Sequence, residues 1–462
     1  MLQRLVNLIP PALSGEANQD SEPNIAVNPA NTNQMVATAF TPDPLQGPNA
    51  PIYVSSDGGQ TWALRTVVPG DGPAGTGDIS VGFASGSGIL YVGILSADAP
   101  ANQTRLQILR NTSYLSTATM PVLVDRLGVD QPWVVAASAQ DQAGQAADHV
   151  YVGNNDLAAQ PKTATVDLSL NAAAAAAPAG FATHRIEAGA PVGQDGPPIR
   201  IAVHPAGTIY AAHQRWTAVS GNNITFEVVV TRDDNWAAAA NPFAALTDPA
   251  DGSAGMRAAT GLTAVWNGSM GQERLGADSA IAVDPTNRDV VWIAWGDQPG
   301  GARAPWTIHV RRSVDGGQTW SGDLRTVSKG KNPCLAVNAA GHLGFLCQAL
   351  IGRGTAQRWE TTFEVTTDGW ATAAVPTVLH TALAASPAFT FLPYLGDYAR
   401  VVAVDNAFYG VFSGSNHPDR ANFPNGVTYQ RNVDWNAHRL LDLDGTTAVP
   451  DSIDPFFFTW TD

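Results

Sequence analysis

Acidic side chains recur at one place in the sequence, shortly before a short apolar run. Glu22, Asp130 and Asp278 each lie four residues before the centre of such a run. Three further acids precede other runs at offsets of two, seven and six residues, namely Asp78, Asp195 and Asp397. If the runs are strands that converge on one axis, these carboxylates form a ring. We therefore predict catalytic carboxylates among Asp130, Asp278, Asp397 and Glu22.

Crowded carboxylates suit glycoside hydrolysis. Like charges raise the pKa of one acid, which can then hold a proton and act as general acid. A separation of about 5 Å suits a nucleophile, whereas about 6.5–9.5 Å leaves room for a water molecule. Two alternatives stay open at this point. Each acid could instead cap backbone N–H groups of a neighbouring repeat, or several of the oxygens could together bind Ca²⁺.

Polar and aromatic side chains near the same strand ends could bind a sugar, because an aromatic face stacks on the ring while amides, acids and guanidinium groups bond its hydroxyls. For the aromatic residues, packing between repeats is the alternative role. The predicted substrate-binding residues are Asp78, Asp195, Arg274, Arg215, Asp156, Asp297, Trp133 and Tyr398.

The elements that would position these residues form a repeat along the whole chain. Each copy has a polar start, a short apolar strand, a turn and a second apolar strand. Three of the six spacings between the strand centres are 54 residues. Each apolar strand is continuous rather than alternating, which indicates burial on both faces. The strand centres are Ala26, Ser80, Val134, Ala202, Ala282, Ala336 and Ala403.

A second motif follows some of these hairpins, with the form Ser-x-Asp-Gly-Gly-Gln-Thr-Trp. It predicts a tight turn in which the Asp accepts backbone N–H bonds, glycine supplies the positive φ, and the Trp fills the space beside the next repeat. Two copies are complete, and two more, at residues 231–236 and 366–370, are degenerate. Their structural residues are Asp57, Trp62, Asp315, Trp320, Asp368 and Trp370.

This motif is the Asp-box, or BNR repeat, and with it the chain resembles the sialidase-like β-propeller superfamily, in particular bacterial proteins described as exo-α-sialidase-like. The resemblance runs from Glu22 to about Leu440 and implies a ring of blades with a ligand site at one end of the central axis. Sialidases of this family use three arginines, a Tyr–Glu pair and an Asp, with an Arg-Ile-Pro motif before the first Asp-box. The sequence has no Arg-Ile-Pro, so classical sialidase activity is not expected.

We therefore predict an all-β fold, a single propeller with seven four-stranded blades, or six as the alternative. The propeller should span residues 21–440. Residues 1–20 form an N-terminal segment that could close the ring, and residues 441–462 form a C-terminal segment that packs on it. Closure by Leu2–Pro10 or by Asp454–Trp460 is equally compatible with the sequence. Protected strand edges favour a monomer.

Composition limits the partners. The formal net charge is −15 and only three lysines occur. Nucleic acid and anionic membrane surfaces both require clustered basic residues, so neither is expected as a partner. No apolar run is long enough to span a membrane. The family resemblance implies secretion or the cell surface, but the N-terminus does not resemble a signal peptide, so a cytoplasmic location remains an alternative.

The two cysteines, Cys334 and Cys347, flank a short turn. If the turn comprises residues 339–342, pairing of the two strands sets the cysteines opposite each other and close enough for a disulfide. Two buried free thiols are the alternative.

The sequence thus favours a glycan-directed propeller, either a glycoside hydrolase or a carbohydrate-binding protein, without a certain cofactor. A non-enzymatic platform for protein–protein interaction is the alternative, because propeller faces can serve many functions.

Overall fold

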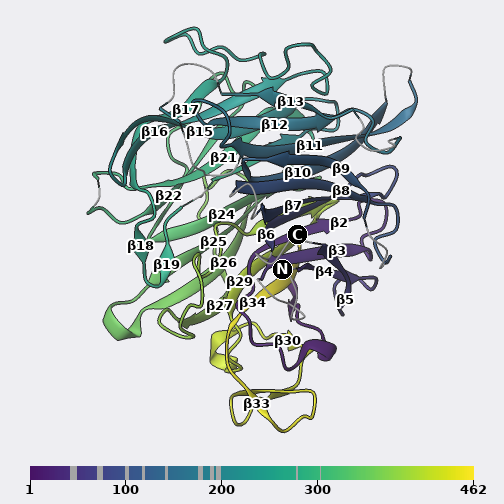
Figure 1. The fold of residues 1–462 in the computed structure, drawn as a ribbon. Helices are drawn as coiled ribbons and strands as arrows, with labels where there is room; N and C mark the ends of the chain where they lie inside the picture. The colour runs from purple at the N-terminus through teal and green to yellow at the C-terminus, as the bar shows by residue number, and fades with distance from the viewer. Residues whose placement is uncertain are drawn as a thin grey trace.

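The computed structural model describes residues 1–41, 49–69, 76–98, 103–116, 120–140, 144–174, 180–187, 192–193, 199–276, 279–301 and 303–462. Within these residues the regular structure is almost entirely antiparallel β-sheet (Figure 1). The exceptions are three short 3₁₀ turns, η1 (Pro11–Leu13), η2 (Gly354–Ala356) and η3 (Arg420–Asn422). In the described part of the chain, no helix has the length and apolar character to cross a membrane.

Three four-stranded sheets come first along the chain. Each consists of four strands consecutive in the sequence, and neighbours in the sequence are also neighbours in the sheet. Their strands are β2 (Ser21–Val27), β3 (Met35–Phe40), β4 (Asn49–Ser55) and β5 (Ala63–Pro69); β6 (Thr76–Phe83), β7 (Leu90–Asp98), β8 (Gln103–Asn111) and β9 (Val122–Leu127); and β10 (Val129–Gln140), β11 (Ala146–Asp156), β12 (Thr163–Ser169) and β13 (Ala182–Arg185).

Three more four-stranded sheets follow with the same order. They contain β14 (Arg200–Val203), β15 (Ile209–Ser220), β16 (Asn223–Asp233) and β17 (Met256–Val265); β20 (Ser279–Asp284), β21 (Asn287–Asp297), β22 (Thr307–Ser313) and β23 (Arg325–Ser328); and β24 (Gly330–Val337), β25 (Leu343–Ile351), β26 (Arg358–Thr366) and β27 (Thr377–Leu383). Short accessory strands outside these sheets are β18 (Ser269–Met270), β19 (Glu273–Arg274), β31 (Val433–Asp434), β32 (Arg439–Leu441) and β33 (Ala448–Val449).

The seventh sheet joins the two ends of the chain, which lie side by side in Figure 1. Its order is β28-β29-β34-β1-β30. The bounds are β28 (Arg400–Val404), β29 (Ala407–Ser415), β34 (Ile453–Thr461), β1 (Leu2–Asn7) and β30 (Thr428–Tyr429). The C-terminal strand therefore supplies the third position of this sheet and the N-terminal strand the fourth, so both termini take part in closing the ring.

The first strands of the seven sheets surround one axis. Contacts run from β2 to β6, β10, β14, β20, β24 and β28 in turn, and β28 contacts β2. Every predicted strand centre lies in one of these first strands. The predicted all-β propeller is thus confirmed, and the described residues form seven sheets of four or five strands.

The hydrophobic core is divided into layers between neighbouring sheets. One cluster joins Val36 and Ile52 of the first sheet to Val81 and Val92 of the second. The next cluster joins the second sheet to the third, and the others repeat this arrangement around the ring. Each sheet is therefore buried on both faces, which explains why the first strands are continuously apolar.

The Asp-box motif lies in the turn between the third and fourth strands of a sheet. In its first copy, the Asp57 carboxylate accepts hydrogen bonds from Thr61 N at 3.0 Å and from the Thr61 hydroxyl at 2.6 Å. The Ser55 hydroxyl accepts a bond from Gly59 N at 2.9 Å. Trp62 is buried and packs edge-on against Phe457 of β34, with 5.1 Å between ring centroids. This turn therefore packs against the strand that closes the ring.

The other copies have related contacts. Thr319 N donates to Asp315 at 2.9 Å, and the Asp368 carboxylate accepts from Thr372 N at 2.9 Å. Trp320 is half-buried. Trp370 contacts Phe345 edge-on, at 5.9 Å between ring centroids. The local hydrogen-bond pattern is therefore kept even where the sequence motif is degenerate.

Of the two alternatives for the cysteines, the structure has the free thiols, because both cysteines are free and buried. Leu346, not Cys347, lies opposite Cys334. The turn is one residue longer than predicted, because Asn338 N donates to His342 O and the Asn338 side chain accepts from His342 N. A shift of one residue puts the two side chains on opposite faces of the sheet, and each thiol packs in a different core layer.

Removing a core ring from the closing strand should destabilise the whole propeller. Phe458 is fully buried and contacts Phe363 at 5.0 Å between ring centroids. We expect Phe458→Ala to lower the free energy of unfolding by about 3–5 kcal/mol, measured by urea denaturation. Phe389→Ala is the control because Phe389 is 47% exposed. Equal small effects of both changes would show that the closing strand adds little to stability.

Candidate functional site

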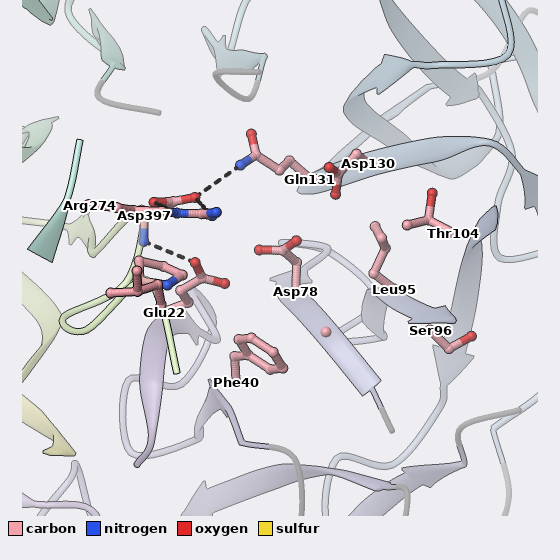
Figure 2. A pocket seen from close by; sticks show the side chains of 13 residues that line it. Glu22, Phe40, Asp78, Leu95, Ser96, Thr104, Asp130, Gln131, Arg274 and Asp397 are labelled. Atoms are coloured by element: carbon pink, nitrogen blue, oxygen red, sulfur yellow. Dashed lines mark hydrogen bonds and ion pairs between the residues drawn. The ribbon is translucent and has the colours of Figure 1, made fainter. Parts of the chain in front are cut away.

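Three of the first strands contain, at their second or third residue, a residue in the left-handed backbone region. These residues are Glu22 (φ 52°), Gln131 (φ 54°) and Asn332 (φ 54°), and each precedes a proline. The pairing with the second strand shifts register at each of these places. Such a register shift is a β-bulge, and a β-bulge changes the direction in which a side chain points. Here Glu22 and Gln131 point into the same open space near the axis (Figure 2).

That open space is a cavity of about 280 Å³. Four carboxylates, one guanidinium group and an aromatic ring are among the groups that line it, and Figure 2 shows the polar side chains converging on its centre. The lining residues are Glu22, Phe40, Gly77, Asp78, Leu95, Ser96, Thr104, Asp130, Gln131, Arg274, Leu392, Pro393 and Asp397.

Asp397 is the most heavily bonded acid of the cavity. It is 2% exposed and forms an ion pair with Arg274, whose Nε lies 3.3 Å from Oδ1. Gln131 Nε2 lies 3.5 Å from its Oδ2, and Lys331 Nζ lies 3.7 Å from its Oδ1. The charge of Arg274 is therefore already directed at a protein carboxylate and not at the open cavity.

Glu22 and Asp78 are hydrogen-bonded to each other, so each affects the pKa of the other. Burial, followed by the nearby charges of Asp78 and Asp397, raises the pKa of Glu22 well above its usual range. Burial also raises the pKa of Asp78, and the hydrogen bond with Glu22 opposes that rise without cancelling it. Two adjacent buried carboxyl groups cannot both ionise at low cost, which is why the pKa of each is raised. The Glu22–Asp78 pair is therefore the candidate proton donor of the cavity.

A further acid, Glu273, does not line the cavity and is fully buried. Its Oε2 accepts a hydrogen bond from Leu395 N, and its Oε1 is 3.9 Å from Lys331 Nζ. Burial raises the pKa of Glu273 to about 8, although the Lys331 charge and the bond from Leu395 lower it. The burial of this carboxyl group therefore raises its pKa by more than the ion pair with Lys331 lowers it.

Aromatic rings and cations from several first strands also pack together. The guanidinium groups of Arg200 and Arg400 lie over the ring of Trp133, at 3.7 and 4.7 Å from its centroid. Tyr398 contacts Trp133 edge-on at 5.8 Å. Arg400 donates to Asn24 Oδ1, Val81 O and Val134 O at 2.7–3.1 Å, and thereby ties three first strands together. Trp133 and Tyr398 thus belong to this packing and do not line the cavity.

The structure brings five of the predicted site residues to the cavity, namely Glu22, Asp78, Asp130, Arg274 and Asp397. Asp195 and Asp278 lie outside the described residues.

Three further predicted binding residues do not line the cavity. Arg215 pairs with Glu227 at 2.5 Å, Asp156 pairs with Arg126 at 2.8 Å, and Asp297 bonds His309 at 2.9 Å. Arg215, Asp156 and Asp297 all belong to second strands. Second strands lie one position farther from the axis than first strands. The partners of Arg215 and Asp297 belong to the same sheets as these residues, whereas Arg126 belongs to β9 of the preceding sheet.

Sequence reasoning missed Gln131, Lys331 and Thr104. The available signal for Gln131 was the polar residue before proline that recurs as Glu22-Pro23, Gln131-Pro132 and Asn332-Pro333. Aligning the repeats on these prolines puts Gln131, and not Asp130, at the position of Glu22. Thr104 comes from a third strand, β8, and no repeat pattern marks it.

The acids of the cavity do not form a metal-binding cluster by geometry. Among the described residues, the group of three that brings its ligand atoms within 4.8 Å of one another lies elsewhere and comprises Glu16, Asp20 and Asp454. Among the described acids of the ring, no three bring ligand atoms this close together.

No family model matches the sequence, and a search of curated protein sequences finds no match. Solved structures with a similar overall arrangement include a GH93 α-L-arabinofuranosidase of Fusarium graminearum in complex with arabinobiose. It has 11% sequence identity and a TM-score of 0.44, over 98% of this chain and 97% of that one. An α-L-arabinanase of Penicillium chrysogenum complexed with arabinobiose has 10% identity and a TM-score of 0.44, over 98% of each chain.

The NanB sialidase of Streptococcus pneumoniae is more distant. It has 10% identity and a TM-score of 0.39, over 89% of this chain and 67% of that one. Likenesses at this level concern the arrangement of strands and carry no argument about activity.

The raised pKa of Glu273 predicts a pH dependence of stability. Between about pH 4.5 and pH 8 the folded state binds more protons than the unfolded state, so the free energy of unfolding falls as pH rises. Glu273→Gln should remove up to about 1 kcal/mol of this fall per pH unit and be more stable than wild type at pH 8, with no gain below pH 4.5. Thermal melts across this range provide the measurement.

Glu360→Gln, on the third strand β26, is the control and should follow the wild-type profile. A Glu273→Gln profile parallel to that of wild type would show that Glu273 is ionised throughout.

Proposed function

We propose that the protein is a glycoside hydrolase acting on neutral sugars, with its active site in the axial cavity. The observation that carries this proposal is the set of four carboxylates around a cavity of about 280 Å³, with one guanidinium group that is already paired. Small-molecule sites commonly measure about 300–1,000 Å³. A cavity at the lower limit suits one terminal sugar unit, which favours cleavage from a chain end.

The roles follow from the environment of each acid. Asp78 supplies the proton to the leaving-group oxygen, because burial raises its pKa and Glu22 shares its proton. Asp130 acts from another side of the cavity, as Figure 2 shows, and serves as the nucleophile or as the base for water. Asp397 holds Arg274 and Gln131 in place, and Phe40 offers an aromatic surface for the sugar ring.

Charge supports a neutral substrate. The one guanidinium group of the lining faces Asp397 rather than the cavity centre. Recognition of a sugar carboxylate depends on charge-assisted bonds from cations, and the four acids of the lining would repel such a group. The classical sialidase reaction, which needs an arginine cluster, is therefore not proposed.

Turnover of fluorogenic glycosides tests the proposal. The panel should include arabinofuranosides, galactosides, glucosides and a sialoside. We expect turnover of a neutral member and a fall in kcat of at least about 100-fold in both Asp78→Asn and Asp130→Asn. Asp125→Asn is the control, because Asp125 is an exposed acid on β9 paired with Arg105.

Thermal melts of the same variants separate catalysis from stability. Lost activity with an unchanged melting temperature supports the proposed roles, whereas equal activity in all variants contradicts them. Binding of a sugar without turnover would identify a lectin-like protein. No response to any sugar would favour the protein-interaction alternative, to be followed by pull-down experiments.

A further inference from the structure

A second cluster of acids lies where the ends of the chain meet, and it is separate from the axial cavity. Glu16 and Asp20 belong to the segment between β1 and β2, and Asp454 lies near the start of β34. Asp20 N donates to Ile453 O at 2.7 Å, which joins the two segments directly. One ligand oxygen from each of the three acids lies within 4.8 Å of the other two.

The three acids differ in how their oxygens are satisfied. Asp454 accepts hydrogen bonds from Asn7 and Asn416, both at 2.7 Å, and from Arg431 at 3.2 Å. Asp20 is 1% exposed, and among the described residues neither of its carboxylate oxygens has a hydrogen-bond partner. Glu16 Oε2 is also buried without such a partner. Three buried carboxylate oxygens, one from Glu16 and two from Asp20, therefore receive no hydrogen bond from the described residues.

An uncharged oxygen completes the set. The Thr41 hydroxyl is fully buried and, in the described part of the chain, has no hydrogen bond of acceptable geometry. It lies beside Asp20. Burial, the main cause, raises the pKa of Asp20 well above its usual range, and this nearby hydroxyl lowers it slightly. A buried acceptor set of acids and a hydroxyl without donors is the environment that a hard cation satisfies.

Among the described residues, one guanidinium group faces the three carboxylates of the cluster. Arg431 is fully buried and contacts Asp454 with Nη1, but its Nη2 donates to the backbone oxygen of Ser14 at 2.8 Å. One guanidinium group against three carboxylates leaves two negative charges if the acids are ionised. A divalent cation would neutralise both of these charges.

From this geometry we propose that Glu16, Asp20 and Asp454 form a Ca²⁺ site that clasps the N-terminal segment to the C-terminal strand. Ca²⁺ accepts six to eight oxygens at about 2.3–2.6 Å in irregular arrangements, so oxygens on opposite sides of the ion lie about 5 Å apart. Glu16 and Asp20 bind through their donor-free oxygens, Thr41 adds its hydroxyl, and water fills the remaining positions. The ion stabilises closure of the ring.

Direct binding of Ca²⁺ to the full chain tests this proposal. After removal of metals with EDTA and dialysis, isothermal titration should show one site per chain, and millimolar Ca²⁺ should raise the melting temperature by several degrees. Asp20→Asn should weaken binding at least tenfold and remove the thermal shift. Asp444→Asn is the control, because Asp444 is an exposed acid in a turn of the C-terminal region.

If Asp20→Asn fails to fold, Glu16→Gln provides the same test with one donor-free oxygen replaced. The proposal is overturned if wild type binds no Ca²⁺ at millimolar concentration, or if both cluster variants bind it as wild type does. It is also overturned if acidification below pH 6 stabilises the protein while Ca²⁺ has no effect, since protons would then neutralise the cluster.

Discussion

Closure of the ring is the constraint on which the rest of the structure depends. The two termini pair in one sheet, where β34 lies between β29 and β1. Because that sheet contacts the first one through β28 and β2, the seven first strands are fixed around one axis. The buried rings of Phe456, Phe457 and Phe458 anchor the closing strand in the core. The Asp-box turn at Trp62 packs on the same strand.

A closed ring brings polar strand ends together at the axis, and that crowding creates the chemistry. Bulges turn Glu22 and Gln131 toward the centre. Asp78 and Asp130 approach from β6 and β10, and Asp397 approaches from the segment before β28. Burial raises the pKa of Glu22 and of Asp78, and Arg274 pairs with Asp397. Arg400, bonded to three different sheets, maintains the spacing between them. The site is thus a consequence of architecture more than of any local motif.

The sequence predicted the propeller well, because burial on both faces gives each first strand a continuous apolar pattern around centres such as Ala26 and Ala336. It also predicted that Glu22, Asp78, Asp130 and Asp397 converge. The sequence did not reveal features that depend on the register of a strand by one residue. The turn between Cys334 and Cys347 is one residue longer than predicted, so the two cysteines do not face each other. A bulge likewise places Gln131, and not Asp130, at the position in its repeat that Glu22 has in the first repeat. Arg215 and Asp156 could not be excluded from sequence, because their partners Glu227 and Arg126 are apparent only in three dimensions.

The proposed active site requires the sugar to lie in the axial cavity. A crystal structure of Asp78→Asn, soaked with a neutral glycoside that wild type hydrolyses, would show where the sugar binds, because the substitution should slow cleavage and preserve binding. We expect one sugar unit in the cavity, with Asp130 within about 3 Å of a sugar oxygen or of a water beside the anomeric carbon. A sugar bound on another face, with only water in the axial cavity, would contradict the proposal.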